Sequence, residues 1–205
     1  MKTLTFNAYT FSELSDAAKE FARDWFRQSS GFDADYVTND AKQIGAMLGL
    51  SEMQIFWTGC SSQGDGACFS ARWQSSAVKI GGVKDYAPQD KELHRIAAEF
   101  ERISGAFQFS SFTVQHRGHY YHENCTEFAM SITDSQDNEI ETPAAIQAEK
   151  DLIVAAKDFM RWIYRTLEKE YTWQNEDEQV DENISCNDYL FTETGRRTVV
   201  LNQAA

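Results

Sequence analysis

Hydrophobic and polar positions follow two different periods along this chain. Apolar residues at every second position predict strands with one buried face, whereas apolar residues at i, i+3, i+4 and i+7 predict amphipathic helices. By the first pattern we expect strands over 3–9, 54–57 and 67–74, a hairpin within 106–133 and a closing hairpin within 189–201. By the second we expect helices after Ser15, over 34–48, between Pro88 and Gly105, and from Pro143 to about Glu170, with 75–88 irregular.

These elements predict an α+β fold, in which about four helices pack on one face of a mainly antiparallel sheet. No period of 20–50 residues repeats, which excludes solenoids and propellers. The only two prolines are Pro88 and Pro143, so no Pro-rich linker divides the chain. We therefore expect residues 1–205 to form a single domain, because a chain of this size buries roughly 70% of its unfolded surface without disulfides or metal.

The net charge of −13, from 32 acidic and 19 basic residues, narrows the choice of partners. A surface this acidic is repelled by phosphate backbones and anionic lipids, so we expect no direct nucleic acid and no membrane partner. It attracts a protein with a basic surface and can mimic the nucleic acid that such a surface binds. The alternative is that acidity serves solubility alone. The candidate acidic surface is the densest acidic run: Glu176, Asp177, Glu178, Asp181 and Glu182.

Targeting and redox signals are few. Residues 1–9 lack the apolar stretch of a secretory leader, and the longest apolar run, 152–156, is too short to cross a bilayer. We therefore expect a cytoplasmic protein. The cysteines form no Cys-x-x-Cys pair, so we expect reduced thiols rather than a disulfide or zinc framework. They are Cys60, Cys68, Cys125 and Cys186.

Three of the four histidines lie within a single hairpin. If Arg117-Gly118 is a two-residue turn, His116 faces His119, while His122 points to the opposite face of the ladder. Cys125 then lies roughly 20 Å along its strand from His119. Since tetrahedral zinc needs all its ligands within about 2.3 Å of one ion, this segment makes a poor metal site.

The same hairpin is a candidate contact surface. Its face carrying Phe107 and Phe109 is expected to be the core face, which leaves an aromatic and imidazole-rich tip at the other end. The alternative is an ordinary surface patch whose polar groups already have hydrogen-bond partners and which binds nothing. The candidate binding residues are His116, His119, Tyr120, Tyr121 and His122.

A second candidate is the glycine-rich loop of the preceding hairpin. Glycines on both sides of Asp65 permit positive-φ conformations, which expose backbone N–H groups to a partner or an anion. Asp65 is either a turn residue or a catalytic or metal-binding carboxylate. No G-x-S-x-G, H-E-x-x-H or G-x-G-x-x-G pattern accompanies it, so we expect no cofactor. The candidate binding residues are Ser62, Gln63, Gly64, Asp65 and Gly66.

Five segments spread over nearly the whole chain resemble a known family. They are YTFSELSDAAK at 9–19, DAKQIG at 40–45, QGDGA at 63–67, GHYYH at 118–122 and NDYLFTETG at 187–195. In this order they resemble small acidic proteins of bacteriophages and prophages that are often labelled "antitoxin of toxin–antitoxin stability system". The resemblance implies a phage or mobile-element origin, a bacterial cytoplasm and a role in neutralising another protein.

Three functions follow as hypotheses. The first is a non-enzymatic accessory protein that binds and neutralises a toxin or host-defence factor by covering its basic surface. The alternative is a metal-assisted hydrolase or nucleotide-processing enzyme, if the fold brings Asp65 beside His116, His119 or Glu123. A phage structural or assembly component is a third possibility. The oligomeric state stays open.

Overall fold

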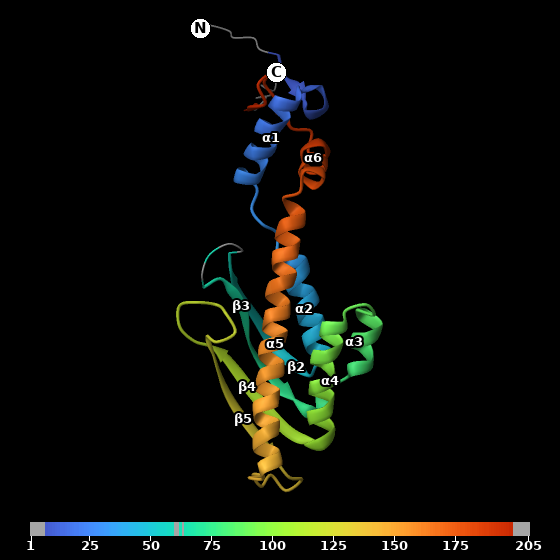
Figure 1. The fold of residues 1–205 in the computed structure, drawn as a ribbon, viewed down its shortest axis with the longest axis vertical. Helices are drawn as coiled ribbons and strands as arrows, with labels where there is room; N and C mark the ends of the chain where they lie inside the picture. The colour runs from blue at the N-terminus through green and yellow to red at the C-terminus, as the bar shows by residue number, and fades with distance from the viewer. Residues whose placement is uncertain (1–6, 60–61, 63, 199–205) are drawn as a thin grey trace, which may run out of the picture. The chain divides into compact units, whose positions relative to one another are not determined.

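The computed structural model describes residues 7–59, 62 and 64–198. Their contacts divide the chain into two compact units, which are described separately (Figure 1). Unit 1 consists of Met1–Asp33 and Lys169–Ala205, and unit 2 of Ala34–Glu168. The longest helix, α5 (Pro143–Gln174), supplies residues to both units. The single domain expected over residues 1–205 stays a prediction.

Unit 2 is built on an antiparallel sheet of four strands in the order β2-β3-β4-β5. The strands are β2 (Leu50–Thr58), β3 (Gly66–Gln74), β4 (Phe109–His116) and β5 (Thr126–Thr133). Trp73 of β3 stands opposite Phe112 of β4, and their stacked rings lie 5.3 Å apart. Because both side chains are almost fully buried, this pair marks the face of the sheet that carries the core.

Helices cover that face of the sheet, as α5 does in the view of Figure 1. Phe69 of β3 packs on Phe159 of α5 at 5.9 Å, and Trp73 packs on Phe100 of α4 at 6.0 Å. Aromatic pairs of this kind add to the free energy gained by burying the rings. The other helices of unit 2 are α2 (Asp35–Met47), α3 (Ile80–Tyr86), α4 (Lys91–Ala106) and the 3-10 turn η2 (Ser75–Ala77).

Two expectations for unit 2 are wrong. Residues 75–88 are not irregular: they contain α3, whose Ile80 and Val83 are buried although two of its seven residues are glycine. The core face of β4 is also the opposite of the expected one. Phe109 is 54% exposed, whereas Phe112 and Val114 are 2% and 1% exposed. Side chains point to opposite faces at successive positions of a strand. The helices pack on the face that carries Phe112, which leaves Phe109 on the exposed face.

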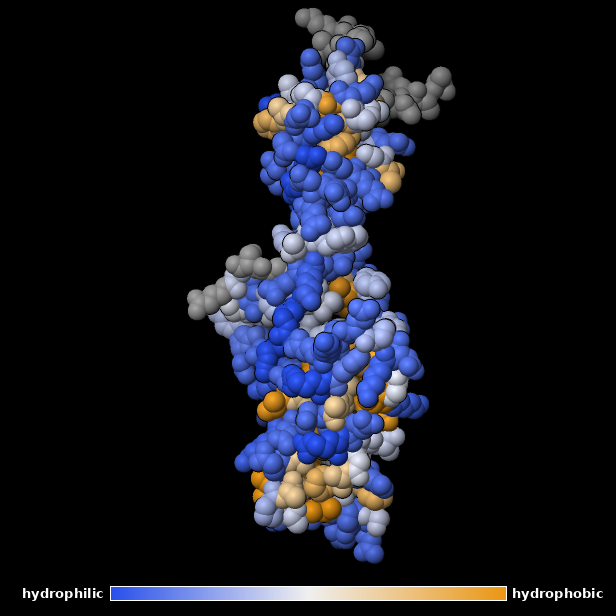
Figure 2. Space-filling view, turned by 45° about the vertical axis from the view of Figure 1, so that its right-hand side comes forward, coloured by the Kyte–Doolittle hydropathy of each residue, from blue (hydrophilic) through white to orange (hydrophobic). Residues whose placement is uncertain are grey.

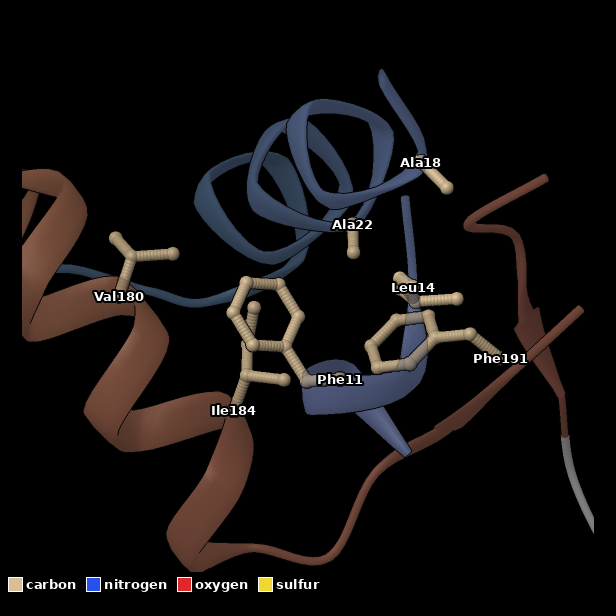
Figure 3. Packing of buried hydrophobic residues seen from close by; sticks show 7 residues of the cluster. All are labelled: Phe11, Leu14, Ala18, Ala22, Val180, Ile184 and Phe191. Carbon is tan, nitrogen blue, oxygen red and sulfur yellow. The ribbon is translucent and has the colours of Figure 1, made fainter. Parts of the chain in front are cut away.

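Unit 1 has a small sheet, in the order β1-β6-β7, beside two helices. Its strands are β1 (Tyr9–Thr10), β6 (Leu190–Phe191) and β7 (Arg197–Thr198), and its helices are α1 (Asp16–Ser29), α6 (Asp177–Cys186) and the 3-10 turn η1 (Phe11–Glu13). Figure 3 shows the apolar cluster between them, in which Phe11 and Phe191 meet edge to face at 6.4 Å. The strand expected over 3–9 falls mostly on residues 1–6, which lie outside the described residues.

Two local features hold the N-terminal end of α1. Ser15 caps the helix as expected, because its hydroxyl accepts a hydrogen bond from the Ala18 N–H at 3.3 Å. The turn between β6 and β7 places Gly195 against the same residue. A Cβ on Gly195, whose φ is +82°, would lie 2.0 Å from the Ala18 carbonyl oxygen. Only glycine therefore fits at this turn.

The expected α+β fold is confirmed, with two antiparallel sheets in place of one. Each unit contains one of the two sheets together with helices of its own. In the described part of the chain, no helix combines the length and the apolar character that a membrane span requires.

Candidate functional site

The loop between β4 and β5 is longer than the sequence predicts. His116 pairs with Thr126, so nine residues, 117–125, connect the strands, and the predicted two-residue turn at Arg117-Gly118 is wrong. His116 consequently does not face His119. The loop makes its own hydrogen bonds instead: the Cys125 N–H donates to the His122 carbonyl at 2.9 Å. This internal bonding explains why the strands do not continue to a tight turn.

This loop meets the glycine-rich loop between β2 and β3. A Cβ on Gly66 would lie 2.7 Å from both Cα and Cβ of His122, and a Cβ on Gly64 would lie 3.3 Å from Cδ1 of Tyr120. The two loops therefore pack directly on each other through glycines. We call the described residues of both, Ser62, 64–66 and 117–125, the loop tip. Gln63, Ser61 and Cys60 lie outside the described residues.

Asp65 makes the contacts of a turn residue within the loop tip. Its Oδ2 accepts a hydrogen bond from the Ser62 N–H at 2.6 Å, and its own N–H donates to the Ser62 carbonyl at 3.1 Å. Its carboxylate also fills the space beside Gly59, where a Cβ would lie 2.6 Å from Oδ2. This is the local bonding by which Asp shapes turns.

The three histidines of the segment have different neighbours. His116 packs against both Phe56 and Tyr121, with ring centroids 5.0 and 4.9 Å away, and its Nε2 donates to the Tyr120 carbonyl at 3.0 Å. His119 contacts the Tyr120 ring edge to face at 5.5 Å. Within the residues that the structure describes, no group of three or more His, Cys, Asp and Glu side chains is arranged to hold a metal ion.

His122 lies beside a thiol. Its Nε2 is 3.4 Å from Sγ of Cys125, and its Nδ1 accepts a hydrogen bond from the Asn124 N–H at 3.2 Å. The ring of His122 also stacks with that of Tyr120 at 6.3 Å. Cys68 of β3 is buried, and burial, together with the charge of Cys125, raises its pKa to about 12.

Helix α5 anchors the loop tip on one side. Nζ of Lys157 donates to the Asn124 side-chain oxygen at 3.1 Å, and the Arg161 guanidinium lies 3.9 Å from the Glu123 carboxylate. Tyr120 is left 56% exposed at the loop tip. The roles of Lys157 and Arg161 were not predicted from the sequence, because both residues lie far from the loop along the chain.

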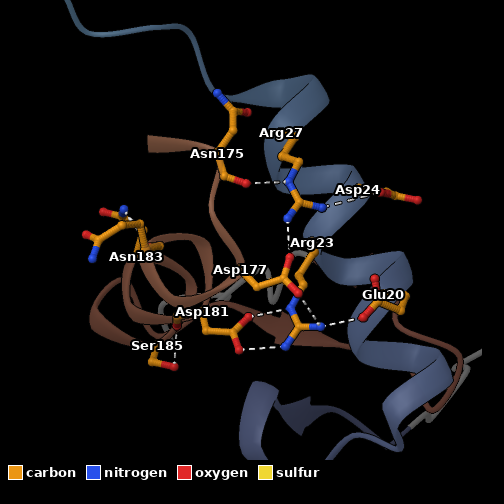
Figure 4. A network of polar contacts seen from close by, with 10 residues as sticks. Glu20, Arg23, Asp24, Arg27, Asn175, Asp177, Asp181, Asn183 and Ser185 are labelled. Atoms are coloured by element: carbon orange, nitrogen blue, oxygen red, sulfur yellow. Dashed lines mark hydrogen bonds and ion pairs between the residues drawn. The ribbon is translucent and has the colours of Figure 1, made fainter. Parts of the chain in front are cut away.

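The predicted acidic surface has a structural role in unit 1 (Figure 4). Asp181 accepts two hydrogen bonds from the Arg23 guanidinium, both 2.7 Å long, and Asp177 pairs with Arg27. The Asp181 carboxylate raises the pKa of the Arg23 guanidinium. The matching spacing of four residues on the two helices was a signal that sequence reasoning missed. Glu176, Glu178 and Glu182 remain exposed.

The comparisons with known proteins bear mainly on unit 2. The model of a family described as "Domain of unknown function (DUF8835)" matches residues 34–177. The matched region begins where unit 2 begins and includes both loops of the loop tip. Searches among curated proteins and among solved structures find no match.

Proposed function

The chain belongs to the family described as a domain of unknown function, DUF8835, and from the geometry of the loop tip we propose that it is a non-enzymatic protein that binds and neutralises another protein. The partner is a toxin or host-defence factor with a basic functional surface. The proposed setting is the cytoplasm of a bacterium that carries a phage or mobile element. The observation that supports the proposal most is the contact of Gly64 and Gly66 with Tyr120 and His122.

The composition of the loop tip suits protein recognition. Tyrosine supplies a large contact area at a small cost in conformational entropy, and serine, glycine and asparagine supply adaptable hydrogen bonds, as in antibody paratopes. Here Tyr120 is 56% exposed and stands beside Gly64, while Asn124 and Ser62 are also exposed. Because the two loops pack on each other and the 117–125 loop also contacts α5, much of this surface is ordered before a partner binds, which lowers the cost of binding.

Charge supports a basic partner. The face of the molecule seen in Figure 2 is mostly hydrophilic, with apolar side chains in scattered groups, and the whole chain carries a net charge of −13. Such a charge steers a basic surface toward the protein and speeds association at low salt. The resemblance of the sequence to phage-encoded antitoxin-like proteins agrees with a neutralising role.

Capture of a partner by the immobilised full-length protein tests the proposal. Tyr120→Ala removes the exposed ring of the loop tip, and Tyr36→Ala is the matched control, since Tyr36 is 75% exposed on α2. We expect a stoichiometric basic protein from a bacterial lysate to be lost with Tyr120→Ala and retained with Tyr36→Ala. Equal capture by both variants, or turnover of a small molecule by the purified protein, would contradict the proposal.

A further inference from the structure

The outer edge of β5 presents backbone groups that point away from the sheet. The Arg117 N–H donates to the Cys125 carbonyl at 2.7 Å, which is one of the two bonds of a hydrogen-bonded pair and lies in register with the β4–β5 ladder. Hydrogen-bonded and non-hydrogen-bonded pairs alternate in an antiparallel ladder. The backbone N–H and C=O groups of the even-numbered residues of β5 therefore point away from β4. The Ile132 carbonyl has this outward direction, because it accepts a hydrogen bond from the Ile140 N–H, outside the β4–β5 ladder, at 2.9 Å.

Part of this edge is uncovered in unit 2, where Figure 1 shows β5 as the outermost strand. A bridge between Thr133 and Glu139 covers its last residue. Among the described residues, no strand pairs with β5 on the outside at Phe128 or Met130. The N–H and C=O of these two residues therefore form a short template for another strand.

The two edges of the sheet differ in a way that favours β5 as the template. On β2 the register shifts between Ser51 and Gln54, and Glu52 has φ +53°. A bulge of this kind interrupts an edge and protects it from pairing. The eight pairs of β5 with β4 run from Thr126 to Thr133 without a shift, and β5 contains no lysine, arginine or proline.

Charge indicates what kind of strand fits there. From Gly118 to Glu149, the region that contains β5, the chain has seven carboxylates and no lysine or arginine. The Glu127 side chain, on the face of β5 away from the helices, is 70% exposed. Its ion pair with Arg117 at 3.0 Å is exposed as well and is therefore weak. The seven carboxylates are Glu123, Glu127, Asp134, Asp137, Glu139, Glu141 and Glu149.

The other face of the same edge is apolar. Phe128 stands opposite Val114 and Met130 opposite Phe112, and the half-buried side chains of Phe128 and Met130 extend the core to the edge of the sheet. An added strand would cover these two side chains with apolar residues of its own at alternate positions. The residues between them would point to the side of Glu127 and are expected to be basic.

We propose that an extended, basic segment of the partner adds to β5 as a fifth, antiparallel strand, with apolar residues opposite Phe128 and Met130 and basic residues beside Glu127. This inference rests on the proposed function and names the partner's chemistry. It also defines a second contact surface, since β5 begins directly after the 117–125 loop.

A synthetic peptide in which valine and lysine alternate over eight residues tests the inference without the natural partner. In an antiparallel pair opposite Phe128 and Met130, the N–H groups of the valines face β5 and those of the lysines face away. We expect N-methylation of the valines to weaken binding by about tenfold or more, and N-methylation of the lysines to leave it unchanged, since about 1.4 kcal/mol corresponds to tenfold. Replacing every lysine with glutamate is expected to abolish binding.

Amide hydrogen exchange locates the peptide on the protein. We expect the amides of Phe128 and Met130 to become protected when the peptide binds. Those of Glu127 and Ala129 should change little, because they already bond to β4. Equal affinity of the two N-methylated peptides, or unchanged exchange at Phe128 and Met130, would overturn the inference.

A substitution in β5 tests the same edge by changing the protein instead of the peptide. Met130→Pro removes an outward N–H and no hydrogen bond to β4, so the sheet is expected to stay folded, while Met130→Leu keeps the edge intact. We expect peptide affinity to fall about tenfold in the first variant and to persist in the second. Partner capture lost with Tyr120→Ala but retained with a folded Met130→Pro would overturn strand addition and leave the proposed function standing. The peptide measurements decide the question if Met130→Pro does not fold.

Discussion

The backbone of His122 occupies the space that a side chain on Gly66 would need, since a Cβ there would lie 2.7 Å from the His122 Cα. Gly66 is the first residue of β3 and His122 belongs to the loop before β5, so this contact joins two hairpins. Through this contact the two loops form one continuous surface, the loop tip.

Gly66→Ala is therefore expected to separate the two loops. Its methyl group meets backbone rather than a flexible side chain, so the 117–125 loop must move, and we expect the free energy of unfolding to fall by roughly 1–3 kcal/mol. Partner capture should weaken as in Tyr120→Ala. Urea denaturation and the capture assay measure the two effects.

Gly105→Ala is the matched control for this substitution. Gly105 lies within α4, and a Cβ placed on it has no atom within 4 Å. Replacing an exposed helical glycine is expected to raise the free energy of unfolding by roughly 0.5–1 kcal/mol. The prediction is contradicted if Gly66→Ala is as stable as Gly105→Ala and captures the partner equally well. The close contact between the two loops would then be needed neither for stability nor for partner binding.

The pairing of Arg23 with Asp181 is expected to hold α6 against α1. The side chain of Arg23 is only 15% exposed, so Asp181→Ala leaves a poorly solvated charge with weaker partners. We expect it to lower the free energy of unfolding by roughly 1–3 kcal/mol. Faster amide exchange along α6 would be the local sign of this loss.

Asp24→Ala provides the comparison, because it removes a weak ion pair from the same helix. Asp24 is 65% exposed and lies 3.7 Å from Arg27, and such a pair contributes within about 0.5 kcal/mol. If Asp181→Ala destabilises no more than Asp24→Ala, the acidic run is a solvated surface and not a structural contact.

Tyr86 is expected to titrate at high pH. Its hydroxyl donates a hydrogen bond to the Asp40 carboxylate, which is the main cause that raises the pKa of Tyr86 to about 12. The neutral phenol is thus favoured in the folded protein, compared with a pKa of about 10 in the unfolded chain. The stabilising contribution is complete below pH about 10 and is lost as the pH rises toward 12.

Carbon-13 NMR of labelled tyrosine follows this titration directly. Asp40→Asn removes the negative charge and should return the pKa of Tyr86 toward about 10. A wild-type protein in which Tyr86 already titrates near that value would contradict the hydrogen bond to Asp40.

The thiols are expected to react in an order set by burial. Cys186 is exposed at the end of α6, whereas Cys68 is buried and its pKa is raised to about 12. Alkylation with iodoacetamide at pH 8, followed by mass spectrometry, should modify Cys186 in the native protein and Cys68 only after denaturation, because the thiolate is the reactive form. Cys186→Ser should lower the number of fast-reacting thiols by one. Fast modification of Cys68 would show that β3 is accessible.

Local sequence predicted those elements whose signals lie within a few residues. Pro143 at the first turn and the apolar stripe that follows predicted α5, and Ser15 predicted the start of α1. The contacts that define these helices join residues four positions apart or fewer, so the sequence contains them directly. The α+β class followed from the same signals.

Distant contacts decided the rest. Gly118 has φ +92° and looks like a hairpin turn, yet contacts with Gly66 and with Lys157 of α5 hold the loop in a longer form. Helix α3 was missed because two glycines weaken it locally, and only the burial of Ile80 and Val83 compensates. The sequence by itself determined the α+β class, the helices with strong local signals such as α1 and α5, and the charge. Tertiary structure decided the register of β5, the buried face of β4 and the meeting of the two loops, because each depends on the packing of residues far apart in the chain.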